Sequence, residues 1–256
     1  MSNNVTFHDL KNASVFITGG GSGIGAAITE GFLAQGAKVA FVQRSECEEF
    51  IETMSSKYNH KPLFIKCDIT DTKALQKAIF KANEAHGGIN ALVNNAANDS
   101  RHSLDEMTTE EWDQSININL RPHFFTAQAV APIMRSQGGG SIINFSSASY
   151  LMGNAGYPAY VASKAGITGL TRSLARELGS DNIRVNSLIP GWVLTKKQLK
   201  LWANEADLAS HLEKQCIKEH LIPNDLIDST LFLASDASRM ITGQALVIDG
   251  GVVVTG

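Results

Sequence analysis

Ser14 to Gly25 reads SVFITGGGSGIG, a short apolar run followed at once by a cluster of glycines. The β-branched run predicts a buried strand, and the glycines open a helix that continues through Phe32 and Leu33. Glycines at this junction let the backbone turn tightly and approach a pyrophosphate, whose charge a helix N-terminus stabilises. Because the cluster lies between a strand and a helix, it predicts a dinucleotide site and not merely a packing turn.

The rest of the chain repeats this alternation of short apolar runs with longer helix-like stretches. The pattern predicts an α/β fold, a Rossmann-type doubly wound parallel sheet of about seven strands with helices on both faces. At 256 residues we expect a single domain spanning 1–256. The predicted strands are Ser14 to Thr18, Lys38 to Val42, Leu63 to Cys67, Ala91 to Asn94, Ser141 to Phe145, Ile183 to Ile189 and Ala245 to Ile248.

Two further segments have a recognisable pattern. Thr108 and Glu111 have the spacing of a capping box, which predicts a helix running through Pro122 towards Arg135 with a kink at the proline. Residues 194–219 interrupt the alternation, and their Leu, Trp and Lys content predicts an amphipathic lid over a substrate site.

Composition narrows the class of ligand. The formal charge is −3 and there is no run of Lys or Arg, which argues against nucleic acid or an anionic membrane as partner. The N-terminal residues lack the pattern of a signal peptide, so we expect a cytoplasmic protein. Three scattered cysteines and seven histidines without ligand spacing predict neither disulfides nor a metal site. The ligand is therefore expected to be a small molecule.

The end of the second predicted strand bears on cofactor choice. A NAD site usually has an acidic residue there, which accepts hydrogen bonds from the adenosine ribose. This chain has Gln43, Arg44 and Ser45 instead. A guanidinium can pair with a ribose phosphate, so the segment favours NADP over NAD. The alternative is that Arg44 is only a solvated surface charge.

Tyr160 is the one tyrosine of four that is followed by a lysine four residues later, Lys164. On a helix this spacing puts both side chains on one face. A nearby ammonium stabilises a phenolate and lowers the tyrosine pKa from its usual value of about 10. The pair is compatible with an acid/base site, but exposed Tyr and Lys neighbours are common on helices, and its position among the other motifs is what favours the functional interpretation.

These motifs, taken in order along nearly the whole chain, resemble the short-chain dehydrogenase/reductase family. Ala97 departs from the family pattern, which has glycine there, and we expect the backbone to tolerate the change. The motifs are the glycine stretch, Asp68, Asn94 to Ala97, Asn119, Ser147 thirteen residues before Tyr160, Lys164, and Pro190 and Gly191 followed by Thr195.

The resemblance implies a catalytic role for several residues. Tyr160 would be the acid/base, and Ser147 would hydrogen-bond the reacting oxygen. Ser146, its neighbour, is the less favoured alternative because of the thirteen-residue spacing. Lys164 would hold the nicotinamide ribose hydroxyls and lower the pKa of Tyr160.

The remaining implied roles concern proton relay and cofactor binding. Asn119 would anchor a water that relays protons, with Asn117 as the less favoured alternative. Asp68 would bind the adenine edge, Asn95 would lie beside the adenosine ribose, and Thr195 would reach the nicotinamide amide. The family also commonly forms homotetramers. The expected cofactor-binding residues are Gly19, Ser22, Gly23, Ile24, Gly25, Arg44, Asp68, Ile69, Asn95, Ala96, Tyr160, Lys164, Pro190, Gly191, Val193 and Thr195.

A narrower resemblance concerns the substrate. Residues 94–102, 112–113, 118–121, 128–130 and 143–145 resemble bacterial sugar 1-dehydrogenases such as D-xylose dehydrogenase, which implies an aldose oxidised at its anomeric carbon to a lactone. The polar cluster at 98–102 offers the donors and acceptors that a sugar needs, although a solvated, self-capped loop is an equal alternative. Tyr150, Asn154 and Trp192 could supply an aromatic face. The expected substrate contacts are Asp99, Arg101, His102, Ser147, Ser149, Asn154, Tyr160 and Trp192.

Three other functions stay open at this point. A reductase of 3-oxoacyl or other carbonyl compounds would need a basic patch for an acidic carrier, for which Lys196, Lys197 and Lys200 are the candidates. A secondary-alcohol dehydrogenase would need a more apolar entrance. A non-catalytic nicotinamide-binding sensor would typically lack the tyrosine or the lysine, and this chain has both.

Overall fold

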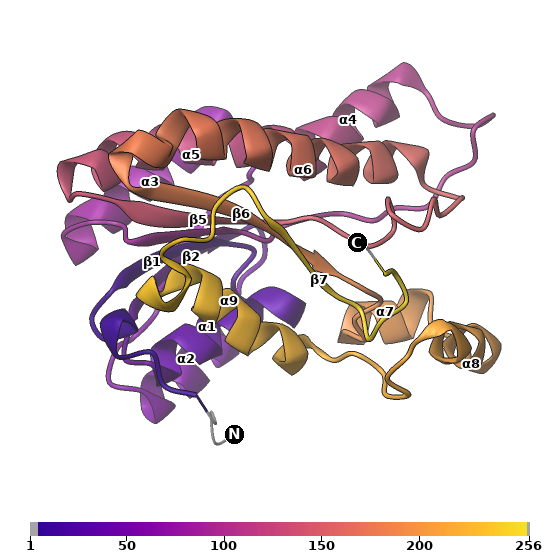
Figure 1. The fold of residues 1–256 in the computed structure, drawn as a ribbon, viewed down its shortest axis with the longest axis horizontal. Helices are drawn as coiled ribbons and strands as arrows, with labels where there is room; N and C mark the ends of the chain where they lie inside the picture. Colours follow the sequence, from indigo (N-terminus) through magenta and orange to yellow (C-terminus); the bar gives the residue numbers. More distant parts are fainter. Residues whose placement is uncertain (1–4, 255–256) are drawn as a thin grey trace.

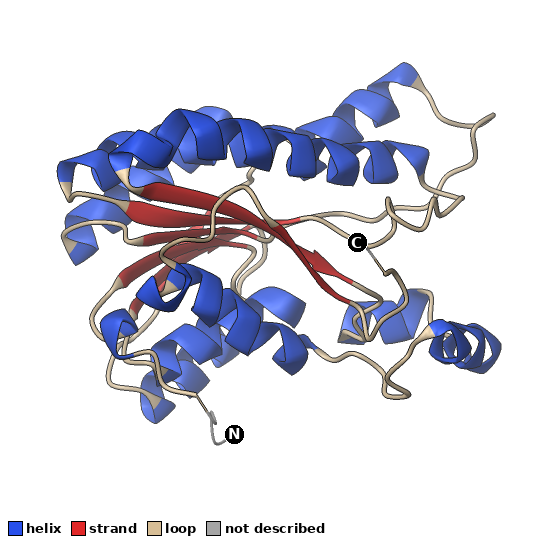
Figure 2. Cartoon of the chain, viewed as in Figure 1, coloured by secondary structure: helices blue, strands red, loops and turns tan. Residues whose placement is uncertain are grey.

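Seven parallel strands form one twisted sheet in the computed structural model, which describes residues 5–254 (Figures 1 and 2). Their order is β3-β2-β1-β4-β5-β6-β7, and every neighbouring pair is parallel. The predicted doubly wound sheet is thereby confirmed. The strands are β1 Ser14–Thr18, β2 Lys38–Gln43, β3 Leu63–Lys66, β4 Ala91–Asn94, β5 Gly140–Phe145, β6 Ile183–Pro190 and β7 Ala245–Ile248.

Helices cover both faces of the sheet, as Figure 1 shows. Alternate side chains of each strand therefore enter different hydrophobic layers: Val15 and Ile17 pack with α1 and α9, whereas Phe16 packs with α3 and α5. One face carries α1 Gly23–Ala34, α2 Glu48–Lys57 and α9 Ile227–Ala234, and the other carries α3 Thr72–His86, α4 Thr109–Asn119, α5 Arg121–Ser136 and α6 Pro158–Leu178.

The predicted helix through Pro122 is two helices. The capping box at its start is confirmed, since Thr108 Oγ1 accepts from Glu111 N at 3.2 Å and Glu111 Oε2 accepts from Thr108 N at 3.0 Å. However, α4 ends at Asn119, and Leu120 leaves the helical backbone region at φ −122° before α5 begins. Pro122 lies in the first turn of α5, where its missing N–H costs nothing and its ring bars the continuation of α4.

The strand order reverses between β1 and β4, because the chain winds outward in both directions from this pair. In such sheets a crevice opens beyond the carboxyl ends of the two strands. Residues 194–219 form α7 Lys196–Leu201 and α8 Glu205–Lys214, which lie beyond the end of β7 at this edge (Figure 1). No helix within residues 5–254 combines the length and apolar character that a membrane crossing requires.

Candidate active site

A cleft of about 1530 Å³ lies at the carboxyl ends of the strands. The structure brings nearly all the predicted site residues together in it. Asn119 and His102 are the two that do not line it. The predicted residues in its lining are Gly19, Ser22, Gly23, Ile24, Gly25, Arg44, Asp68, Ile69, Asn95, Ala96, Asp99, Arg101, Ser147, Ser149, Asn154, Tyr160, Lys164, Pro190, Gly191, Trp192, Val193 and Thr195.

The glycine loop between β1 and α1 forms one end of the cleft. A Cβ added at Gly25 would collide with the carbonyl oxygen of Gly19, and Gly19 itself has a φ of +72° that side chains rarely adopt. Ser22 makes no side-chain cap, so the first-turn N–H groups of α1 stay available to an anion. Asn95 Nδ2 donates to the carbonyl oxygens of Thr18 and Gly19 at 3.1 and 3.2 Å. The loop has the shape and polarity that a pyrophosphate needs.

Gln43 closes on the glycine loop, a contact that the sequence analysis did not identify. Its Oε1 accepts from Gly21 N at 3.0 Å, and its Nε2 donates to Ser45 O at 2.9 Å. Arg44 Nη1 lies 3.7 Å from Asp68 Oδ2, and the Arg44 side chain is 74% exposed. Partial burial of Asp68 is outweighed by hydrogen bonds from Thr70 and by Arg44, so its pKa is lowered. This end of the cleft thus combines an exposed guanidinium with an amide whose oxygen already accepts a hydrogen bond.

Three of the four predicted catalytic residues, Ser147, Tyr160 and Lys164, meet at the floor of the cleft. Tyr160 and Lys164 lie one turn apart on α6, with the Lys164 Nζ 5.4 Å from the Tyr160 ring centroid. Ser147, just past β5, lies beside the Tyr160 hydroxyl, and its Oγ accepts from Ser149 N at 3.2 Å. Lys164 is almost fully buried and its Nζ donates to Phe145 O at 2.8 Å. The arrangement places a hydroxyl pair next to a buried amine.

The pKa of Tyr160 is not lowered as the sequence analysis expected. Burial raises the pKa of the phenol, and the hydrogen bond from Ser147 opposes this only in part. Burial also lowers the pKa of Lys164 to about 7, because the apolar surroundings disfavour the ammonium. The Lys164 amine is directed at the Phe145 carbonyl, so its charge is only partly available to stabilise a phenolate on Tyr160.

Two alternatives from the sequence analysis lie away from the reacting end. Ser146 Oγ donates to Lys164 O at 2.7 Å and thereby fixes the backbone of α6. Asn117 Oδ1 accepts from Arg121 at 3.4 Å, and Asn117 does not line the cleft.

Asn119, the favoured asparagine, is fully buried at the end of α4. Its amide is hydrogen-bonded to both backbone groups of Asn98, at 2.8 and 2.9 Å. Its side chain therefore fixes the loop after β4.

His123 on α5 is a buried group that the sequence analysis missed. It is 2% exposed, and neither ring nitrogen has a hydrogen-bond partner of good geometry among the described residues. Burial, and secondarily the charge of Lys164, lowers its pKa to about 3. A neutral histidine therefore lies close to the catalytic lysine. No local pattern in the sequence distinguishes it from an exposed histidine on the same helix.

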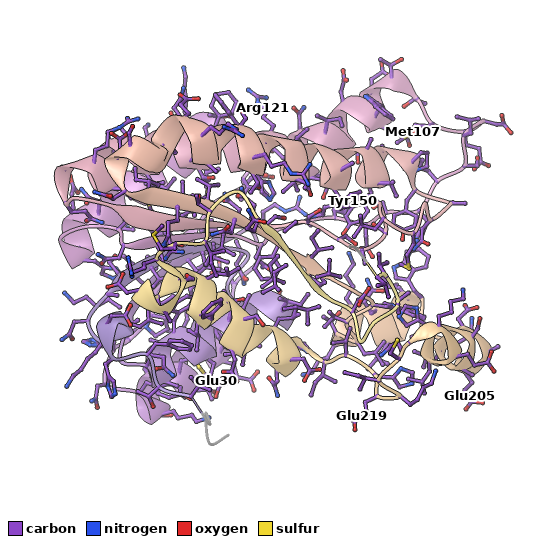
Figure 3. All side chains as sticks on the ribbon, viewed as in Figure 1. Glu30, Met107, Arg121, Tyr150, Glu205 and Glu219 are labelled. Carbon is purple, nitrogen blue, oxygen red and sulfur yellow. The ribbon has the colours of Figure 1, made fainter. Side chains whose placement is uncertain are left out.

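The outer wall of the cleft comes from the loop after β4 and from residues 194–219. The Arg101 guanidinium lies 3.7 Å from the ring centroid of Tyr157 and 5.2 Å from that of Trp202. Tyr157 and Trp202 are aromatic residues of the lining that the sequence analysis missed, and the Tyr157 ring is buried, with Tyr160 stacked on it at 5.4 Å. Tyr150, which is labelled in Figure 3, was expected to supply an aromatic face. It instead accepts a hydrogen bond from Thr168 on α6 at 3.2 Å and is not part of the cleft lining.

Several polar atoms of this wall have no hydrogen-bond partner among the described residues. They are Ser149 Oγ, Trp202 Nε1 and His211 Nε2, and all three residues line the cleft. His102 lies outside it, where its Nε2 accepts from Ala159 N at the start of α6, at 3.4 Å. Buried polar groups are normally hydrogen-bonded, so these three atoms are exceptions in the lining of the cleft.

Ala97 has an ordinary backbone conformation, as expected. Within residues 5–254, Asn12 and Asn182 are the residues other than glycine with positive φ, so Ala97 needs no left-handed backbone.

Among residues 5–254, no group of three or more His, Cys, Asp or Glu side chains is arranged to hold a metal ion.

Comparisons with known proteins cover almost the whole chain. A family model described as Enoyl-(Acyl carrier protein) reductase matches residues 19–253. A protein described as a galactose dehydrogenase of Rhizobium meliloti is 48% identical, over 96% of this chain and 97% of its own. D-xylose 1-dehydrogenase of Caulobacter vibrioides is 44% identical over the same shares. A solved structure described as a short-chain alcohol dehydrogenase of Sinorhizobium meliloti is 31% identical, with a TM-score of 0.91, over 96% of this chain and 98% of its own.

Proposed function

The chain belongs to the short-chain dehydrogenase/reductase family of NAD(P)-dependent enzymes acting on CH–OH groups, and we propose that it oxidises an aldose at the anomeric carbon to a lactone. The observation that carries the proposal is the full-length identity of 48% and 44% to a galactose dehydrogenase and a xylose dehydrogenase. The lining of the cleft supports it, because polar side chains such as Asn154 and the rings of Trp192 and Trp202 share the same cleft, which suits both the hydroxyls and the C–H face of a sugar.

Tyr160 is the general base of this reaction. Its phenolate takes the proton of the anomeric hydroxyl, while Ser147 donates a hydrogen bond to the same oxygen and holds it in place. The nicotinamide, when bound, supplies the acceptor for the hydride that leaves C1. C1 is thereby oxidised, and its oxygen becomes the carbonyl of the lactone. Because burial raises the pKa of Tyr160, the oxidation should speed up as pH rises.

Lys164 and the lid complete the assignment of roles. The buried Lys164 amine, fixed by its bond to Phe145 O, would hold the ribose hydroxyls of the cofactor beside Tyr160. Residues 194–219 would act as the lid over the substrate, since α7 and α8 contribute Trp202 and His211 to the cleft. Thr195, whose side chain lies close to Gly23, would bind at the nicotinamide end.

The same proposal includes a preference for NADP over NAD. The glycine loop fits a pyrophosphate, because its glycines leave no room for Cβ atoms and its N–H groups are uncapped. At the ribose end the neutral Gln43 turns towards Gly21 and presents no carboxylate to repel a 2′-phosphate. The exposed Arg44 can reach one, although it would have to leave Asp68.

The experiment that tests the function is an initial-rate assay by absorbance of reduced nicotinamide. NAD and NADP are supplied separately, against a panel of free aldoses, sugar acids, secondary alcohols and 3-oxoacyl thioesters. Saturable oxidation of one or two aldoses is the expected result. Turnover of an apolar alcohol or of an oxoacyl compound, with no reaction on any aldose, would discard the sugar assignment and leave the family unchanged.

A further inference from the structure

Asp99 contacts the lid, whereas the sequence analysis expected it to contact the substrate. Its two carboxylate oxygens accept separate hydrogen bonds, from Lys197 Nζ at 2.8 Å and from Gln198 Nε2 at 2.7 Å. Both donors lie in the first turn of α7, almost a hundred residues further along the chain. The Asp99 side chain is only 18% exposed, and each of its two oxygens accepts a hydrogen bond from a lid residue.

Further contacts join the same two segments. Lys197 Nζ also lies 3.4 Å from Asn98 Oδ1, and the Arg101 guanidinium stacks near Trp202 at the end of α7. Gln198 also contacts a residue of the cleft lining, because its Oε1 accepts from Trp192 Nε1 at 3.0 Å. One carboxylate therefore links the loop at 98–101 to α7 and, through Gln198, to the Trp192 indole that lines the cleft.

The burial and charge of Asp99 fit this role. Although burial alone would raise its pKa, the hydrogen bonds from Lys197 and Gln198 and the charge of Lys197 lower it, so the carboxylate stays ionised. α7 itself buries no residue, and a six-residue helix has little stability of its own. Its position over the cleft must therefore depend on contacts such as these.

We propose that Asp99 is a positioning residue that holds α7 in place through Lys197 and Gln198, and so forms the wall that selects the substrate. The proposal rests on the proposed sugar oxidation for the choice of substrate, but the geometry of the contact does not depend on it. Asp99 acts on the substrate through Trp192, Arg101 and Trp202, and makes no direct bond to it.

The kinetic test compares Asp99→Asn with Lys197→Met. The asparagine has the same shape but places an NH2 group against one of the two donors, and the methionine removes the ammonium while keeping the length of the side chain. For each variant we expect KM for the best aldose to rise about tenfold while kcat and the cofactor KM change less than threefold. The double variant should be no worse than the poorer single variant, since both remove one contact.

The control is Lys200→Met, on the same helix but outside the cleft lining, which should leave KM unchanged. A direct substrate role for Asp99 predicts a different pattern. In that case Asp99→Asn would raise KM while Lys197→Met behaved like the wild type, and the proposal would be overturned. A fall in kcat without a change in KM would overturn it too.

A second measurement needs no substrate. The chain has three tryptophans, and two of them, Trp192 and Trp202, lie in or next to the lid. In a Trp112→Phe background, acrylamide quenching of the remaining fluorescence therefore reports the packing of this wall. Asp99→Asn and Lys197→Met should both increase quenching, and Lys200→Met should not. Unchanged quenching in both would overturn the proposal. If no aldose is oxidised, the function fails while this measurement still decides the role of Asp99.

Discussion

The floor and the outer wall of the cleft are built in different ways. Tyr160 and Lys164 belong to a 21-residue helix packed along its length, and Lys164 is 1% exposed. The wall consists of a loop and two short helices without buried residues, joined by side chains such as Asp99 and Lys197. The difference teaches that, under the proposed assignment, the reacting groups are fixed by the packing of a long helix, whereas the substrate wall depends on a few polar contacts that can change without unfolding the protein.

The strongest test of the floor is Tyr160→Phe. Removing the phenolic oxygen removes the general base, so kcat/KM should fall by about 10² to 10⁴. The ring and its packing remain, and the affinity for reduced cofactor, measured by its fluorescence, should change little. Turnover at the wild-type rate would remove Tyr160 from the mechanism. The floor of the cleft would then matter no more for catalysis than the outer wall does.

A substitution at Arg44 tests the ribose end of the cleft. If this end resembles the outer wall, one exposed side chain sets the affinity for the cofactor. In Arg44→Ala we expect kcat/KM with NADP to fall roughly tenfold, because a charge-assisted hydrogen bond contributes about 1.5 kcal/mol. Activity with NAD should stay the same and serves as the internal control. An equal loss of kcat/KM with both cofactors would show that Arg44 does not bind a ribose phosphate.

The buried Lys164 makes the stability of the fold depend on pH, because its pKa of about 7 is well below its ordinary value. Between pH 7 and about 10.5 the unfolded chain holds a proton that the folded chain lacks, so the contribution of this group to stability rises with pH. Lys164→Met has no such group. The free energy of unfolding of the variant minus that of the wild type should therefore be largest near pH 6 to 7 and shrink towards pH 10, in urea titrations. A constant difference would contradict the burial of an uncompensated amine.

The smallest effect is expected at His123, which lies behind the floor. Its pKa of about 3 in the folded state is below that of an unfolded histidine, so its contribution to stability is lost as pH falls from about 6.5 towards 3. His123→Leu should unfold at a lower pH than the wild type in an acid titration followed by circular dichroism. His8→Leu, at an exposed position, is the control and should behave like the wild type. An unchanged acid midpoint in His123→Leu would show that this histidine is not buried neutral.

Local patterns were sufficient for the sheet and for the floor of the cleft. The seven predicted strands agree with β1 to β7 to within one residue at each end, because two-sided burial demands continuous apolar runs. The prediction that was wrong concerned the helix through Pro122. The sequence periodicity continues past Leu120, although the helical backbone is interrupted there. Tyr160 and Lys164 were found because their roles depend on a spacing of four residues in one helix.

The wall could not be predicted in this way. Asp99 was expected to contact a sugar because an isolated carboxylate on a loop has no visible partner, and its partners are 98 and 99 residues away. Tyr150 and Tyr157 are equally aromatic and close in sequence, yet only Tyr157 lines the cleft. His123 resembles any helical histidine until the packing of α5 against the sheet buries it.

The sequence by itself determined the parallel sheet, the glycine cradle and the Tyr160 and Lys164 pair, since each depends on periodicity or on spacing within one element. The tertiary structure alone decided how α7 is held over the cleft, which aromatic rings face it, and how burial shifts the pKa values of Tyr160 and Lys164. The physical reason is that partner choice and desolvation depend on atoms brought together by folding from distant parts of the chain, and no local pattern records them.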